Sequence, residues 1–190
     1  MKRITFDIET ANDFIDGNFE PKNLDLALVC IHDSETGVFS CYTKEELPKL
    51  WPIIEKADML VGYNSDHFDV PLLDKYYPGD LTKIRSLDLL KEVKNVLGRR
   101  LKLDNLAEAT LGRKKLADGL QAVRWWAEGR YDLVEQYCIE DVRLTNDLYV
   151  YAREKNSLKY KDYDGVREIK LDTSGWESGG KTTLTHTLPF

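Results

Sequence analysis

The feature that most constrains the fold is the segment from Arg130 to Asn156, which has one continuous helical pattern. Advancing about 100° per residue places its apolar and aromatic side chains, among them Val134, Val142 and Leu148, within one arc of about 180°. A helix with so wide an apolar face has to bury that face against another element. The sequence therefore predicts a long helix that packs along its length on the rest of the fold.

The first half of the chain has the patterns of strands. The predicted strands cover residues 2–9, 26–33, 38–43, 58–64 and 84–90, with a turn at 34–37 between the second and the third. Helical patterns cover residues 44–57, 66–77 and the stretch from 91 to 156, which is broken at Gly98, Gly112, Gly119 and Gly129. This order indicates an α/β fold with a mixed central sheet, antiparallel N-terminal strands plus parallel strands, flanked by helices.

Composition excludes several classes of protein. With 190 residues, 42% of them hydrophobic, the chain can bury the core of one domain. Its longest apolar run, "LALVCI", is far shorter than the roughly 20 residues that span a bilayer, so we expect a soluble, cytoplasmic protein. The cysteines Cys30, Cys41 and Cys138 have no C-x-x-C spacing and are expected to be buried thiols.

Charge is unevenly distributed along the chain. The net charge is −6, yet residues 91–115 contain eight basic and three acidic residues. A basic segment on an acidic body suits a phosphate-binding face, and it equally suits a solvated surface of helices and loops.

One acid interrupts the apolar face of the long helix. Asp141 lies near the middle of the arc, where an ionised carboxylate without a partner destabilises the fold by several kcal/mol. It needs a cation, a hydrogen-bond donor or a solvent-filled cleft, and a buried ion pair with an arginine would also satisfy it. Tyr137, four residues earlier, lies on the same side of the helix and can reach the same point.

Two more acids share one face of the first strand. Side chains alternate along a strand, so Asp7 and Glu9 point the same way, about 6.6 Å apart along the chain. Their charges repel unless something positive lies between them. A fourth acid, Asp69, precedes Pro71 at the predicted start of a helix, where a capping role would explain it by itself.

Taken together, these acids predict a metal site. Hard divalent cations such as Mg²⁺ and Mn²⁺ prefer oxygen ligands, and a site for two of them needs several converging carboxylates. The residues that would supply these carboxylates are Asp7, Glu9, Asp69 and Asp141. A pair of ions about 3.5 to 4 Å apart suits phosphodiester cleavage, because one can activate a water and the other can stabilise the leaving oxygen.

Three motifs resemble those of the DEDD superfamily of 3′-to-5′ exonucleases, also called DnaQ-like, which has a ribonuclease H-like fold. "FDIET" resembles its D-x-E motif, "NSDHFD" its N-x-x-x-F-D motif, and "YCIED" the Y-x-x-x-D motif of the DEDDy branch. The same motifs are similar to the proofreading domains of family B DNA polymerases. The overall pattern, including "GLQAVRWWAEG", is more similar to stand-alone or helicase-linked ribonuclease H-like proteins of the YprB type. The resemblance covers roughly residues 1 to 152.

The resemblance implies a role for each matching residue. Asp7 would bridge two divalent ions, Mg²⁺ or Mn²⁺, Glu9 and Asp141 would complete the first, and Asp69 would hold the second. Tyr137 would orient the attacking water. The implied substrate is the 3′ end of single-stranded DNA or RNA, released as nucleoside 5′-monophosphates, with a helicase or polymerase as a candidate partner in trans.

Five further residues are expected at the substrate. Thr10 and the loop after it would approach the terminal nucleotide, and Asn64 would help to fix the strand. The best candidates for contacts with the nucleic-acid backbone are Arg99, Arg100 and Lys102. An alternative function is a catalytically silent nucleic-acid-binding or interaction module of the same fold.

The predicted domain organisation is a ribonuclease H-like exonuclease domain over residues 1–156 and a C-terminal extension over 157–190 with no assigned role. The end of this extension is polar and rich in glycine, which favours a loosely packed tail or a partner-dependent segment.

Overall fold

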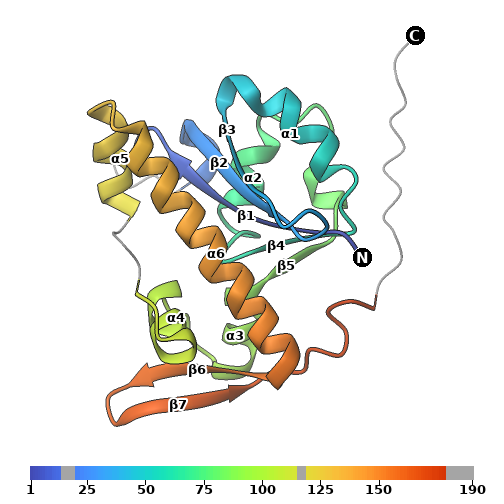
Figure 1. The fold of residues 1–190 in the computed structure, drawn as a ribbon, viewed down its shortest axis with the longest axis vertical. Helices are drawn as coiled ribbons and strands as arrows, with labels where there is room; N and C mark the ends of the chain where they lie inside the picture. The colour runs from blue at the N-terminus through green and yellow to red at the C-terminus, as the bar shows by residue number, and fades with distance from the viewer. Residues whose placement is uncertain (14–19, 115–118, 179–190) are drawn as a thin grey trace.

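The computed structural model describes residues 1–13, 20–114 and 119–178, and its centre is a five-stranded sheet (Figure 1). The strand order is β3-β2-β1-β4-β5. The central strand β1 (Arg3–Thr10) pairs antiparallel with β2 (Leu26–Asp33) and parallel with β4 (Met59–Gly62). The outer strands are β3 (Phe39–Thr43) and β5 (Ser86–Asp88). The predicted mixed sheet is confirmed.

Helices cover both faces of the sheet. On one face, α1 (Leu47–Ile54) and α2 (Asp69–Asp74) pack against the apolar side chains of β1, which include Ile4, Phe6 and Ile8. On the other face, α6 (Tyr131–Lys155) crosses the sheet diagonally (Figure 1). Because side chains alternate along β1, the residues between the apolar ones face α6.

The predicted long helix is confirmed as α6, with its apolar face on the sheet. Val134, Cys138 and Val142 pack against Leu28 and Cys30 of β2. Further along, Leu144, Leu148 and Tyr149 enter a second core together with α3, α4 and the C-terminal strands. Asp141 lies on this buried face and is only 4% exposed.

The helical stretch before α6 divides at glycines, as predicted. The helices are α3 (Leu89–Leu97), α4 (Leu103–Leu111) and α5 (Gly119–Ala127). Gly98 and Gly112 end α3 and α4 in the left-handed conformation, which glycine adopts without a steric penalty. Gly119 differs from the prediction because it begins α5. Short 3-10 helices lie at Pro21–Asn23, Lys44–Glu46 and Leu81–Lys83.

The chain continues after α6 into a hairpin that the sequence analysis did not predict. Strands β6 (Ser157–Asp162) and β7 (Gly165–Lys170) form a separate two-stranded antiparallel sheet. Leu158 and Ile169 of this hairpin are buried in the second core. The predicted division at residue 156 falls at the end of α6 and stays a prediction.

The segment after β7 packs back onto the protein. Trp176 is 4% exposed and stacks on Tyr149, with ring centroids 5.6 Å apart. Its Nε1 donates a hydrogen bond to Glu92 at 3.1 Å. The expectation of a loose tail is therefore wrong for residues 172–178, because one large aromatic side chain anchors them. Residues 179–190 lie outside the described residues.

The cysteines differ from the expectation of three thiols. Cys30 and Cys41 form a disulfide, because they lie opposite each other on the paired strands β2 and β3, with Cα atoms 4.1 Å apart. Cys138 is a buried free thiol. In the part of the chain that the structure describes, none of the helices has both the length and the apolar character needed to cross a bilayer.

Candidate functional site

Strand β1 carries two acids on the face that α6 covers. Asp7 and Glu9 alternate with Phe6 and Ile8, which point into the opposite core. One carboxylate oxygen of Asp7, one of Glu9 and the sulfur of Cys138 all lie within 4.8 Å of one another. The prediction that Asp7 and Glu9 point to the same side of β1 is confirmed, and their carboxylates lie close together.

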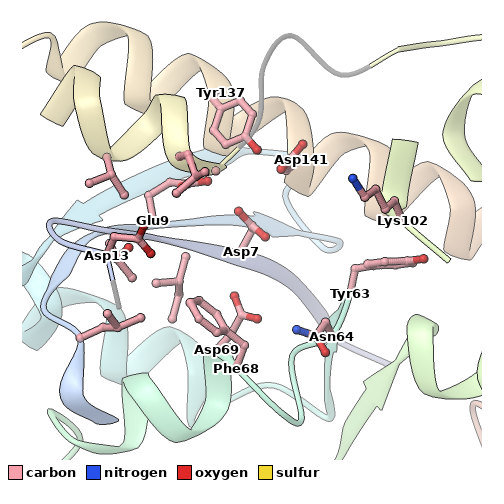
Figure 2. Close-up of a pocket in the computed structure, with 16 residues that line it drawn as sticks. Asp7, Glu9, Asp13, Tyr63, Asn64, Phe68, Asp69, Lys102, Tyr137 and Asp141 are labelled. Atoms are coloured by element: carbon pink, nitrogen blue, oxygen red, sulfur yellow. The ribbon is translucent and has the colours of Figure 1, made fainter. Parts of the chain in front are cut away.

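Helix α6 places Tyr137, Cys138 and Asp141 over these acids. Tyr137 is 2% exposed and its hydroxyl points toward Asp141 (Figure 2). The sulfur of Cys138 lies 3.4 Å from the backbone oxygen of Asp7 and 3.6 Å from its carboxylate. Burial raises the pKa of the Cys138 thiol well above its usual range, and the carboxylates of Asp7, Glu9 and Asp141 raise it further. The thiol therefore keeps its proton and donates to Asp7.

The loop between β4 and α2 supplies the fourth acid. It turns sharply after Gly62, where a Cβ atom would collide with the side chain of Ser65. Asn64 follows in the left-handed conformation, with φ 67°. Helix α2 begins at Asp69, so this carboxylate lies in the first helical turn, where the helix dipole favours negative charge.

Asp88 holds this loop in place. Its carboxylate accepts hydrogen bonds from the backbone N–H groups of Asn64 at 2.8 Å and Asp66 at 3.2 Å. It also caps α3 by accepting from the N–H of Leu90 at 2.9 Å. On the other side, the Arg100 guanidinium donates to the side-chain oxygen of Asn64 at 2.5 Å. The loop that leads to Asp69 is thus held by residues from two neighbouring segments.

These elements enclose a cleft of about 590 Å³. The carboxylates of Asp7, Asp69 and Asp141 face this cleft from three sides, and Asp7 lies between the other two (Figure 2). Glu9 and Tyr137 also line it. The structure therefore brings together all five residues that the sequence analysis assigned to catalysis, while their individual roles stay predictions.

The electrostatics of the cleft favour a positive ion. Burial raises the pKa of Asp69 well above its usual range, and the nearby charge of Asp7 raises it further. Both effects oppose a second negative charge in a buried space unless a cation balances it. The ligand atoms are carboxylate oxygens, which hard divalent ions prefer. The residues present therefore fit a site for such ions.

The predicted substrate contacts have different positions. Thr10, Asn64 and Lys102 line the cleft. Arg100 lies beside it, on Asn64. The guanidinium of Arg99 is turned toward the C-terminal hairpin, 3.4 Å from the carboxylate of Asp162. Contacts of all five residues with a substrate stay predictions.

Other residues of the cleft were missed by the sequence analysis. Asp13 and Tyr63 lie on opposite sides of the acids in Figure 2. Leu120 and Val123 of α5 add apolar lining. Leu120 is 53% exposed, so part of this apolar lining is open to solvent. The helical pattern of α5 was visible in the sequence, but only packing against β1 and α6 shows which surface its apolar side chains line.

A family model described as the RNase H superfamily matches residues 4–153. The chain belongs to the RNase H superfamily. The match spans the five-stranded sheet and nearly all of α6, and so includes every acid of the cleft. Membership supports a nuclease activity in general terms.

Solved structures show the same fold. This RNase H superfamily protein is similar to the family B DNA polymerase from the hyperthermophilic archaeon Pyrobaculum calidifontis, with a TM-score of 0.61 and 21% sequence identity. The similarity covers 80% of this chain and 24% of the polymerase, so the chain spans about a quarter of that protein's length. At this identity the likeness concerns the fold alone. No curated protein matches the sequence.

Proposed function

We propose that this RNase H superfamily protein is a metal-dependent 3′-to-5′ exonuclease of the DEDDy type. It would hydrolyse single-stranded nucleic acid to nucleoside 5′-monophosphates. The observation that carries the proposal is the convergence of four acids from three separate elements in one cleft, with a tyrosine hydroxyl beside the last of them. The direction of cleavage, the products and the DEDDy assignment rest on the resemblance of the three motifs.

The four acids would hold two divalent cations, Mg²⁺ or Mn²⁺. Asp7 lies between Asp69 and Asp141, which suits a carboxylate shared by both ions (Figure 2). Glu9 and Asp141 would complete one site, and Asp69 would hold the other. When bound, such ions lower the pKa of a water and stabilise the charge on the leaving oxygen. The thiol of Cys138 would keep the Asp7 carboxylate in one orientation through its hydrogen bond.

Tyr137 would orient the attacking water through its hydroxyl. The ring is 2% exposed and packs edge-on against Trp125, with centroids 6.4 Å apart, so its position is constrained. Because the hydroxyl is already held in one position, it does not have to be ordered at each turnover before it can align a water. Tyr137 would thus position the attacking water.

The rest of the cleft would hold the terminal nucleotide. Leu120 and Val123 present apolar surface that suits the face of a base. Lys102, which also lines the cleft, would balance the charge of a backbone phosphate. Thr10 and Asn64 supply polar groups near the acids. A cytoplasmic location and a helicase or polymerase partner in trans stay predictions.

The test uses 5′-labelled single strands of DNA and of RNA, incubated with Mg²⁺, Mn²⁺ or EDTA. We expect a ladder that shortens from the 3′ end and disappears with EDTA, in Asp7→Ala and in Asp141→Ala. Asp132→Ala is the matched control, because this acid lies on α6 but in its first turn and exposed. Strand binding without cleavage under any metal would refute the proposal and favour the silent binding module.

A further inference from the structure

The tip of the β6–β7 hairpin exposes an aromatic side chain to solvent. Tyr163 has a relative exposure of 101%, and Val166 on the next strand has 61%. The hairpin does not need either for its own packing, because Leu158 and Ile169 fill the core beneath it. A fully exposed ring at the tip of a hairpin is well placed to stack on a flat partner.

The hairpin is held to α4 along one edge. The backbone N–H and C=O of Lys159 both bond to the hydroxyl of Thr110, each at 2.9 Å. The backbone N–H and C=O of Lys161 bond to the side-chain amide of Asn105, at 2.8 and 2.9 Å. Lys159 thus lies near the end of α4 and Lys161 near its start. The tip, two residues further on, therefore extends past the beginning of α4.

The beginning of α4 is also the rim of the cleft. Lys102, just before α4, lines the cleft, and Arg100 donates to Asn64 inside it. Arg99 turns the other way, with its guanidinium 5.5 Å from the ring centre of Tyr160 and 3.4 Å from Asp162, both on the hairpin. The four residues from 99 to 102 therefore join the cleft directly to the hairpin.

The charges along this path suit a polyanion. One face of the hairpin carries Lys159 and Lys161, in register with Glu168 and Val166. Near the tip, Asp162 pairs with Arg99 and Arg167, and Asp164 with Arg167. Glu168 accepts a hydrogen bond from the Ser157 hydroxyl, and Lys161 lies 4.0 Å from Glu108 with its side chain 63% exposed. Lysines beside a fully exposed aromatic ring are a combination with which proteins bind single-stranded nucleic acid.

We propose that the β6–β7 hairpin is an outer binding surface for the single strand on the 5′ side of the nucleotide in the cleft. The strand passes Lys102 and Arg100, and a base stacks on Tyr163 at the hairpin tip. This inference rests on the proposed function, because it takes the cleft to hold the 3′ end of a strand. It adds a length requirement, since only a strand that reaches the tip gains the extra contact.

The test compares labelled strands of about 4 and about 16 nucleotides, the range of site sizes of single-strand-binding grooves. Binding is measured by fluorescence anisotropy in EDTA, and kcat and KM are measured with Mg²⁺, for DNA and for RNA. We expect Tyr163→Ala to weaken binding of the long strand, and to raise its KM, by about 5- to 10-fold. The short strand and kcat should be unchanged. Lys161→Glu should weaken long-strand binding and flatten its salt dependence.

Matched controls separate local effects from general ones. Tyr131→Ala removes a tyrosine that is 55% exposed but lies against Trp126, away from the hairpin. Lys49→Glu reverses an exposed lysine on α1. Equal binding of long strands by wild type and Tyr163→Ala would overturn the inference even if cleavage occurs. If the protein cleaves no strand but binds long strands in a way that depends on Tyr163, the exonuclease proposal is refuted and the hairpin binding surface is supported. Loss of cleavage of short strands in Tyr163→Ala would also overturn it, because the hairpin would then act on the cleft itself.

Discussion

Replacing Asp69 by asparagine should stabilise the metal-free protein and remove most of the stabilisation that bound metal gives to the wild type. Asparagine keeps the shape of the side chain and removes one charge. The pKa of Asp69 is raised by burial and then by Asp7, so its protonated form is favoured in the folded protein. A raised pKa contributes stability below the unfolded-state value of about 3.9, and that contribution is lost as the pH rises through the folded-state value. Above that value, the metal-free wild type carries an unbalanced buried charge.

The expected magnitudes follow from burial and from linkage. Asp69 is 4% exposed, and an incompletely compensated buried polar group costs about 1–3 kcal/mol. For a chain of this size, 1 kcal/mol shifts Tm by about 2–4 °C, so at a pH above the folded-state pKa of Asp69 the metal-free Asp69→Asn variant should melt at least about 2 °C above wild type. Metal at 100 times its Kd should stabilise wild type by about 2.7 kcal/mol, or about 5–11 °C. The variant should lose most of that gain.

The assay is thermal unfolding followed by circular dichroism, at neutral and at mildly alkaline pH, in EDTA and in excess Mn²⁺. Asp132→Asn is the control, because it removes an exposed acid from the same protein. A wild-type Tm that does not respond to Mn²⁺ would refute the metal site. An Asp69→Asn variant that melts below wild type in EDTA would refute the reasoning about charge. It would show instead that the Asp69 carboxylate stabilises the start of α2.

Three further predictions concern other parts of the molecule. Tyr137→Phe should lower kcat by about 100-fold or more while the affinity for the strand stays within about twofold of wild type. Single-turnover kinetics measures the two separately, and an equal loss of rate and affinity would contradict the water-positioning role. Asp88→Ala should destabilise the fold by about 0.5–2 kcal/mol in urea unfolding, because it removes the cap of α3, and should also lower activity, because it releases the loop at Asn64. If the folded Asp88→Ala variant has the activity of wild type, the position of the Asn64 loop does not matter for the site. Trp176→Ala should cost about 3–5 kcal/mol, since the ring is buried on Tyr149; a change below about 1 kcal/mol would show that residues 172–178 contribute little to the fold.

Elements with a strong local pattern could be predicted from the sequence. Strand β2 occupies the predicted residues 26–33, and α6 was predicted to within one residue at each end. The placement of Asp7 and Glu9 on one face of β1 followed from strand alternation alone. In each case the prediction depends only on the spacing of apolar and polar residues along the chain, which does not change on folding.

The C-terminal hairpin was missed although it left a signal. Asp164 and Gly165 stand between two short runs with alternating apolar residues, a pattern typical of a hairpin turn. Gly165 has φ 124°, which a residue with a side chain rarely adopts. The predicted C-terminal extension over residues 157–190 therefore begins with a pair of strands whose turn residues are visible in the sequence. The pairing of Cys30 with Cys41 was missed because it depends on the register of β2 and β3, which the spacing of cysteines does not show.

The sequence by itself determined which side chains are available and which face of its own helix or strand each occupies. It thereby determined that Asp141 would lie among apolar neighbours and that Asp7 and Glu9 would lie together. Only the tertiary structure decided that β1, α2 and α6 meet, that Lys102 lines the cleft while Arg99 turns to the hairpin, and that α5 adds apolar lining. The physical reason is that periodicity describes orientation about one local axis, whereas the distance between two elements depends on the packing of every segment between them.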